Sequence, residues 1–96
     1  MTATTRRFAT IELNSGYVWW VGEAADEAEA CRKSDAEGGG QTEGQYRRIT
    51  ASEINNTDGG YAVYEAPAGF DVNDGQDEDE IAAVSALPLA GYYRAA

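Results

Sequence analysis

Residues 6–21 read RRFATIELNSGYVWWV, and this stretch decides the fold. Apolar and polar side chains alternate loosely along residues 6–14, a period of two that is typical of a half-buried strand. Asn14 and Gly16 supply turn chemistry because both tolerate positive φ. Residues 17–21 then resume as a strand rich in aromatic and β-branched side chains. The stretch therefore predicts an antiparallel hairpin.

Trp19 and Trp20 are neighbours on the second strand of this hairpin, so we expect their side chains on opposite faces of the sheet. One would enter the core beneath a helix. The other, with one set of the tyrosines Tyr46, Tyr61 and Tyr64, would form an exposed aromatic patch of the kind enriched at protein interfaces. Ordinary packing within the sheet is the alternative.

A helix over residues 27–37 is predicted by a capping box, in which the Asp26 oxygen accepts from an orphan helix amide and Glu29 reaches back. The glycines at 38–40 end this helix. We expect small residues on its inward face, namely Ala24, Ala28 and Cys31, so that the helix lies close over a sheet. Cys31 is the one cysteine of the chain, so no intramolecular disulfide forms, and we expect a buried thiol.

The second half of the chain predicts two more strands, over residues 46–50 and 61–66, paired as a second hairpin around a turn at residues 55–60. A second helix should begin at residues 77–80, with Ile81, Val84 and Leu87 as its apolar stripe, and end at Pro88. The tail, residues 89–94, is either an edge strand or a docked irregular segment.

The order β-β-α-β-β-α predicts an α+β fold, an antiparallel sheet of four to five strands with helix packed on one face. The 96 residues suit a single domain, 1–96. No run approaches the roughly 18 apolar residues of a membrane span, so we expect a cytoplasmic protein.

The acidic segment, residues 71–80, holds six carboxylates and no basic residue: Asp71, Asp74, Asp77, Glu78, Asp79 and Glu80. Outside it 11 acidic and 7 basic residues remain, so more than half of the net charge of −10 lies in about a tenth of the chain. Such charge disfavours direct binding to nucleic acid or to an anionic membrane. A basic partner or a cation is favoured instead.

Catalysis is not expected, because the chain has no histidine, no nucleophile elbow and no imidazole to activate Cys31. A calcium loop would need glycine at its sixth position and glutamate at its twelfth. Counted from Asp71 the glycine is fifth and Ala82 is twelfth, so only weak divalent binding by Asp71, Asn73, Asp74 and Asp77 remains as an alternative. We expect no cofactor and no resident metal.

The acidic segment has three interpretations. It is a solvated loop, or a halophilic adaptation suggested by one lysine against six arginines, or a mimic of nucleic-acid phosphate that occupies a basic groove. Clustering favours the mimic, because halophilic charge should be spread evenly. Unfolding in low salt with refolding in molar salt would favour the halophile.

In size, charge and the expected hairpin, capped helix and hairpin of residues 17–66, the chain resembles the small acidic phage-encoded anti-CRISPR proteins. The resemblance implies a non-enzymatic inhibitor that binds a Lys- and Arg-lined channel of a CRISPR effector, or of another basic nucleic-acid-binding protein, and excludes nucleic acid. The six carboxylates of the acidic segment would make the contact. A second acidic set, Asp26, Glu27 and Glu29, would extend it. The alternative is a small acidic structural or interaction domain whose charge serves solubility.

Overall fold

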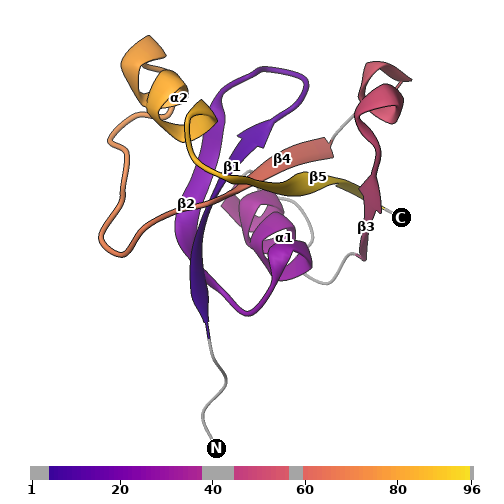
Figure 1. Cartoon of the computed structure of the whole chain (residues 1–96), viewed down its shortest axis with the longest axis horizontal. Helices are drawn as coiled ribbons and strands as arrows, with labels where there is room; N and C mark the ends of the chain where they lie inside the picture. The colour runs from indigo at the N-terminus through magenta and orange to yellow at the C-terminus, as the bar shows by residue number, and fades with distance from the viewer. Residues whose placement is uncertain (1–4, 38–44, 57–59, 96) are drawn as a thin grey trace, which may run out of the picture.

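The computed structural model describes residues 5–37, 45–56 and 60–95 and has the expected α+β fold. Its five strands form one antiparallel sheet in the order β2-β1-β4-β5-β3 (Figure 1). The elements are β1 (Arg6–Glu12), β2 (Val18–Ala24), α1 (Glu27–Glu37), β3 (Tyr46–Ile49), the 3₁₀ helix η1 (Ala51–Asn56), β4 (Gly60–Glu65), α2 (Glu78–Ser85) and β5 (Leu89–Ala95). None of the helices in the described ranges is long and apolar enough to span a membrane.

The predicted first hairpin is confirmed, but it contains a β-bulge. β1 pairs with β2, and the ladder passes from Thr10 opposite Trp20 to Ile11 opposite Val18, so Trp19 is the extra residue. A bulge places two successive side chains on one side of a strand. Trp19 and Trp20 accordingly both pack against the core on the α1 side, and the expectation of opposite faces is wrong.

The second hairpin is also wrong. β4 pairs with β1 and β5, whereas β3 pairs with β5 alone, so the tail forms a strand between β4 and β3. The side chains explain this order. Residues 61–63 of β4 are all buried, as suits a central strand, while Arg47 and Arg48 are exposed on β3, as suits an edge strand. The turn expected at residues 55–60 lies partly outside the described residues.

α1 has the predicted bounds, but its buried face differs from the expected one. Ala30, Cys31 and Ser34 are buried, whereas Ala28 is only half-buried, and the buried Ala24 belongs to β2. Ser34 is buried because its hydroxyl has partners: it lies 2.7 Å from the Thr10 hydroxyl and donates to the Ala30 carbonyl. The glycines expected to end α1 lie outside the described residues.

The two faces of the sheet carry two cores. On one face α1 packs over a cluster of Phe8, Ala24, Ala30, Cys31, Tyr61 and Val63. On the other, α2 packs against β1 and β2, with Val84 fully buried and Ile81 half-buried beside it, as the predicted apolar stripe requires. The predicted end of this helix at Pro88 is wrong: α2 ends at Ser85, and the half-buried Leu87 follows it. Because α2 begins at Glu78 on this frame, the acidic segment is tied to the end of the sheet where β1 turns into β2.

A tyrosine pair fastens α1 to the sheet. The hydroxyl groups of Tyr46 and Tyr61 both donate to the Asp35 carboxylate, at 2.8 Å for Tyr61. Burial first, and then this hydrogen bond, raise the pKa of both phenols above the usual value. α1 is thereby linked to β3, the next strand along the chain, and to β4, which is more distant in sequence.

Candidate functional site

The acidic segment has a defined conformation, and the side chain of Glu80 holds it in place. The Glu80 carboxylate accepts hydrogen bonds from three consecutive backbone amides, those of Asn73, Asp74 and Gly75, with the last two at 3.0 Å. These bonds hold the pKa of Glu80 below its ordinary value. Glu80 is therefore part of the frame of the loop, and not a free contact group as the sequence suggested.

Gly75 seats the same loop on β2. Its carbonyl accepts from the Val18 amide at 2.8 Å, and its φ is +79°. A Cβ at this position would lie 2.3 Å from the Val18 carbonyl oxygen. Only glycine fits this turn without moving the loop away from β2.

Asp77 and Asp71 each make one local hydrogen bond and stay exposed. The Asp77 side chain caps α2 by accepting from the Asp79 amide at 3.0 Å. The Asp71 side chain accepts from the Val72 amide at 2.8 Å. Both carboxylates retain oxygen lone pairs for a partner.

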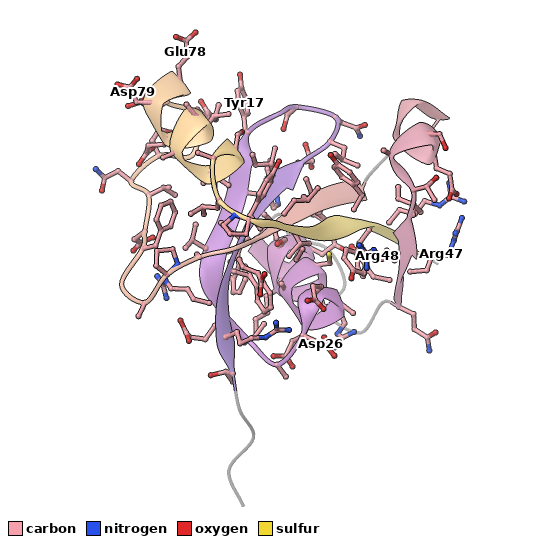
Figure 2. All side chains as sticks on the ribbon, viewed as in Figure 1. Tyr17, Asp26, Arg47, Arg48, Glu78 and Asp79 are labelled. Atoms are coloured by element: carbon pink, nitrogen blue, oxygen red, sulfur yellow. The ribbon has the colours of Figure 1, made fainter. Side chains whose placement is uncertain are left out.

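Five carboxylates of the acidic segment are exposed: Asp71, Asp74, Asp77, Glu78 and Asp79. Figure 2 shows Glu78 and Asp79 at the same end of the molecule as Tyr17. Within residues 5–37, 45–56 and 60–95 the ion pairs link Arg6, Arg7, Lys33 and Arg47 to glutamates elsewhere, and none reaches this segment. Its charge is therefore not compensated by the described part of the chain.

Two residues distant in sequence join this end. Glu37 of α1 lines a hollow of about 290 Å³ together with Asp71, Asp74 and the two tryptophans. Tyr17, which is 40% exposed, borders an adjoining hollow beside Asp74 and Glu37. The sequence did not predict that either residue lies at this end. The one signal for Tyr17 was its position directly after the turn of the first hairpin. The exposed carboxylates of the acidic segment, with Tyr17, are called the acidic end below.

The second acidic set lies apart and is engaged within the chain. Asp26 accepts from the Glu29 amide at 2.8 Å, as expected for a capping box, whereas Glu29 reaches one residue further back than expected and accepts from the Ala25 amide at 2.9 Å. Glu27 pairs with Arg6 at 3.2 Å. Figure 2 shows Asp26 on the far side of the molecule from the labelled α2 carboxylates. The two sets therefore do not form one surface.

The described residues contain no group of three or more His, Cys, Asp or Glu side chains placed to hold a metal ion. Cys31 is fully buried, and burial first, then the nearby Asp35 charge, raise the pKa of its thiol to about 12. A thiol of this kind is not a nucleophile at neutral pH. The arrangement instead offers an array of fixed anionic oxygens beside an exposed aromatic ring.

Comparison with models of protein families, with curated proteins and with solved structures finds no match to this chain. The class that the structure defines is therefore an α+β domain with a preformed acidic end.

Proposed function

We propose that this protein is a non-enzymatic inhibitor that places its acidic end on the basic surface of a nucleic-acid-binding protein, such as a CRISPR effector complex, and blocks nucleic-acid binding there. The observation that carries the proposal is the fixed frame of the acidic segment. Three of the five exposed carboxylates stand on a loop held by Glu80 and by Gly75, and the other two stand on the first turn of α2.

A fixed frame matters because binding costs the entropy of every side chain and loop that must be ordered. In a flexible acidic tail that cost would fall on the complex. Here the backbone of residues 73–75 is already held by Glu80 in the free protein. The exposed carboxylates then meet arginine and lysine side chains that otherwise contact phosphates, through charge-assisted hydrogen bonds.

Tyr17 adds a different kind of contact. Its ring is 40% exposed beside Asp74, and tyrosine is enriched among residues that dominate interface energies. An arginine that bonds Asp74 would also lie within reach of an aromatic face. Phosphate mimicry alone supplies charge, whereas this ring supplies buried area.

The test is capture of purified CRISPR effector complexes and other basic nucleic-acid-binding proteins on the immobilised chain, at low and moderate salt, with competing DNA. The variant D74N/E78Q/D79N removes three exposed charges and leaves Asp77 and Glu80 in place. Exposed ion pairs contribute about 0.2–1 kcal/mol each, so we expect binding to weaken by roughly threefold to a hundredfold.

The matched control is E23Q/E53Q/E65Q, which changes the net charge equally at sites outside the acidic end. Binding of this control should stay near that of the unmodified chain. Equal weakening by both variants would show attraction by net charge alone and would contradict the proposal. Absence of capture from every protein tested would favour the alternative, an acidic domain whose charge serves solubility.

A further inference from the structure

A hollow beside the edge strand β2 joins two parts of the chain that are distant in sequence. It has a volume of about 290 Å³ and is lined by β2, by the loop of residues 71–75 and by Glu37, the last residue of α1. Glu37 and Asp74 also line the adjoining hollow next to Tyr17, so both residues lie where the two hollows meet. The hollow of about 290 Å³ is called the β2 hollow below.

The β2 hollow is negatively charged and receives no cation from the chain. Its charged lining residues are Glu37, Asp71 and Asp74. None of the ion pairs in the described part of the chain involves these three residues, and the remaining residues include no lysine or arginine. Lys33 is bonded elsewhere, because its ammonium donates to the Glu23 carbonyl at 2.7 Å.

The end of α1 adds a negative charge of a different origin. α1 ends at Glu37, and its last turn carries no basic residue. The C-terminal end of a helix carries a partial negative charge, and a cation beside it is stabilising. The Glu37 carboxylate has the same sign as this end of the helix, so it increases the attraction for a cation. Side chains and helix dipole therefore favour the same kind of occupant.

An arginine side chain suits the β2 hollow better than a compact ion. The described residues include no group of three or more His, Cys, Asp or Glu side chains placed to hold a metal ion. A guanidinium presents five N–H donors in a planar fork and bonds carboxylates on two elements at once, whereas an ammonium is a point charge. Trp19 and Trp20 also line the hollow, and arginine contacts aromatic rings more often than lysine does.

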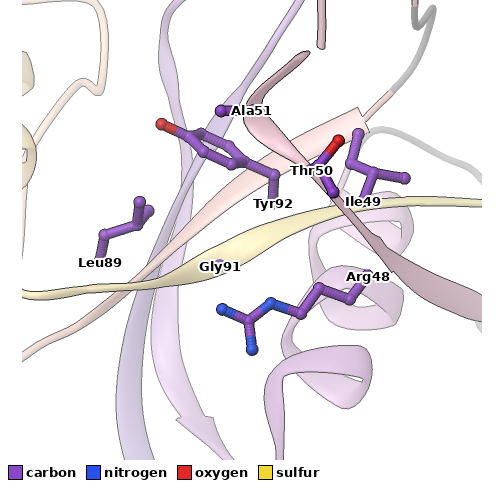
Figure 3. Close-up of a pocket in the computed structure, with 7 residues that line it drawn as sticks. All are labelled: Arg48, Ile49, Thr50, Ala51, Leu89, Gly91 and Tyr92. Carbon is purple, nitrogen blue, oxygen red and sulfur yellow. The ribbon is translucent and has the colours of Figure 1, made fainter. Parts of the chain in front are cut away.

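A hollow at β5 differs in charge and serves as an internal control. It has a volume of about 450 Å³ and is lined by Arg48, Leu89 and Tyr92, among others. Figure 3 shows the Leu89 and Tyr92 side chains on one side of β5 and the Arg48 side chain on the other. Among the described residues no carboxylate lines this hollow, so it offers no partner to a guanidinium.

We propose that the β2 hollow receives one arginine side chain of the basic partner, with the guanidinium between the Glu37 and Asp74 carboxylates. That the arginine belongs to a nucleic-acid-binding protein rests on the proposed function, whereas the affinity of the hollow for arginine does not. The hollow gives the acidic end a preference for arginine over lysine, which phosphate mimicry alone does not supply. Glu37 is then a partner-contacting residue outside the acidic segment.

The experiment is a titration of the isotope-labelled full chain with Nα-acetyl-L-arginine amide at constant ionic strength, followed by heteronuclear NMR. The backbone amide signals of residues 18–21, Glu37 and Asp74 should shift and saturate, with a Kd on the order of 10 mM. The signals of Leu89 and Tyr92 should not shift. The lysine analogue should bind at least about threefold more weakly, and the uncharged citrulline analogue should not bind.

Two variants with equal changes of charge test the position of the site. E37Q/D74N removes two carboxylates that line the hollow, and we expect it to weaken arginine binding by roughly twofold to thirtyfold, the range for two exposed ion pairs. The control E78Q/D79N changes two exposed residues that do not line the hollow, and its Kd should match that of the unmodified chain. The NMR spectrum of each variant reports whether its fold is retained.

Two assays separate a failure of this proposal from a failure of the proposed function. Absence of saturable shifts, equal binding of the lysine analogue, or equal weakening by both variants would overturn the arginine site, even where a basic nucleic-acid-binding protein is captured. So would capture of such a protein that Glu37→Gln leaves unchanged. Saturable binding of the arginine probe without capture of any such protein would support the site and count against the proposed function alone.

Discussion

Replacing Gly75 by alanine tests whether the acidic segment is seated on β2. Gly75 has a φ of +79°, and the Cβ of an alanine would lie 2.3 Å from the Val18 carbonyl oxygen. The loop would have to withdraw, and the hydrogen bond from the Val18 amide to the Gly75 carbonyl, 2.8 Å long, would be lost. Gly69→Ala is the matched control, because Gly69 has a φ of +82° and no atom within 4 Å of the new Cβ.

In both variants, alanine at positive φ destabilises the folded state, and the loss of glycine lowers the conformational entropy of the unfolded chain. The difference between their free energies of unfolding therefore isolates the effect of the Val18 contact. Loss of the hydrogen bond contributes about 0.5–1.5 kcal/mol. Moving the packed backbone adds about 1–3 kcal/mol. We expect Gly75→Ala to be less stable than Gly69→Ala by about 2–4 kcal/mol, and its Tm to be lower by roughly 10–30 °C.

Thermal and urea unfolding followed by circular dichroism measure this difference. The refuting result is an equal Tm for Gly75→Ala and Gly69→Ala, which would mean that the acidic segment does not rest on β2. In that case the fixed frame, on which the proposed function depends, would be absent as well.

Three further predictions concern titrating groups. With its thiol pKa raised to about 12, Cys31 should resist Ellman's reagent at pH about 8 in the folded chain and react fully in guanidinium; rapid reaction while folded would contradict its burial. The pKa of the Tyr46 and Tyr61 phenols is raised in the folded chain, so above pH about 10 these phenols remain protonated in the folded chain but ionise in the unfolded chain. The free energy of unfolding should therefore fall as pH rises past about 10. Tyr61→Phe should cost about 1.5–3 kcal/mol at neutral pH through the lost bond to Asp35, and should flatten this alkaline slope in urea titrations. The pKa of Glu80 is lowered, so its contribution is present above the usual glutamate value and lost as pH falls below it; Glu80→Gln should reduce the acid-side loss of stability, and an unchanged slope would contradict the amide bonds.

Local signals predicted the parts of the fold that depend on near neighbours. The capping residues of α1 lie close to one another in sequence, and the acidic residues in the first turn of α2 are consecutive. Both helices begin where these local signals place them. The first hairpin has a turn that closes on itself, with the Gly16 amide donating to the Glu12 carbonyl. Each of these features is stabilised by residues a few positions apart.

Strand order could not be predicted in this way, because it depends on contacts between distant residues. β3 and β4 are neighbours in sequence and were assumed to pair, but the burial of Val63 on β4 and the exposure of Arg48 on β3 send them to the centre and the edge of the sheet. The bulge at Trp19 is a similar case, since nothing in a run of aromatic residues marks an extra residue. The second hairpin, on which the expected layout of residues 17–66 depended, is consequently absent from the sheet.

The acidic segment shows why a count of charges does not define a binding site. Six carboxylates of similar sequence context take two roles, and the loop conformation decides which. The Glu80 carboxylate accepts hydrogen bonds from three backbone amides and so fixes the loop. Asp74 donates one of these hydrogen bonds through its backbone amide, and its own carboxylate is exposed to solvent. Neutralising Glu80 would therefore disturb the exposed charges indirectly, by releasing the backbone that carries them. Neutralising Asp74, Glu78 and Asp79 would remove charge and leave the frame in place, and for that reason these three residues carry the test of function.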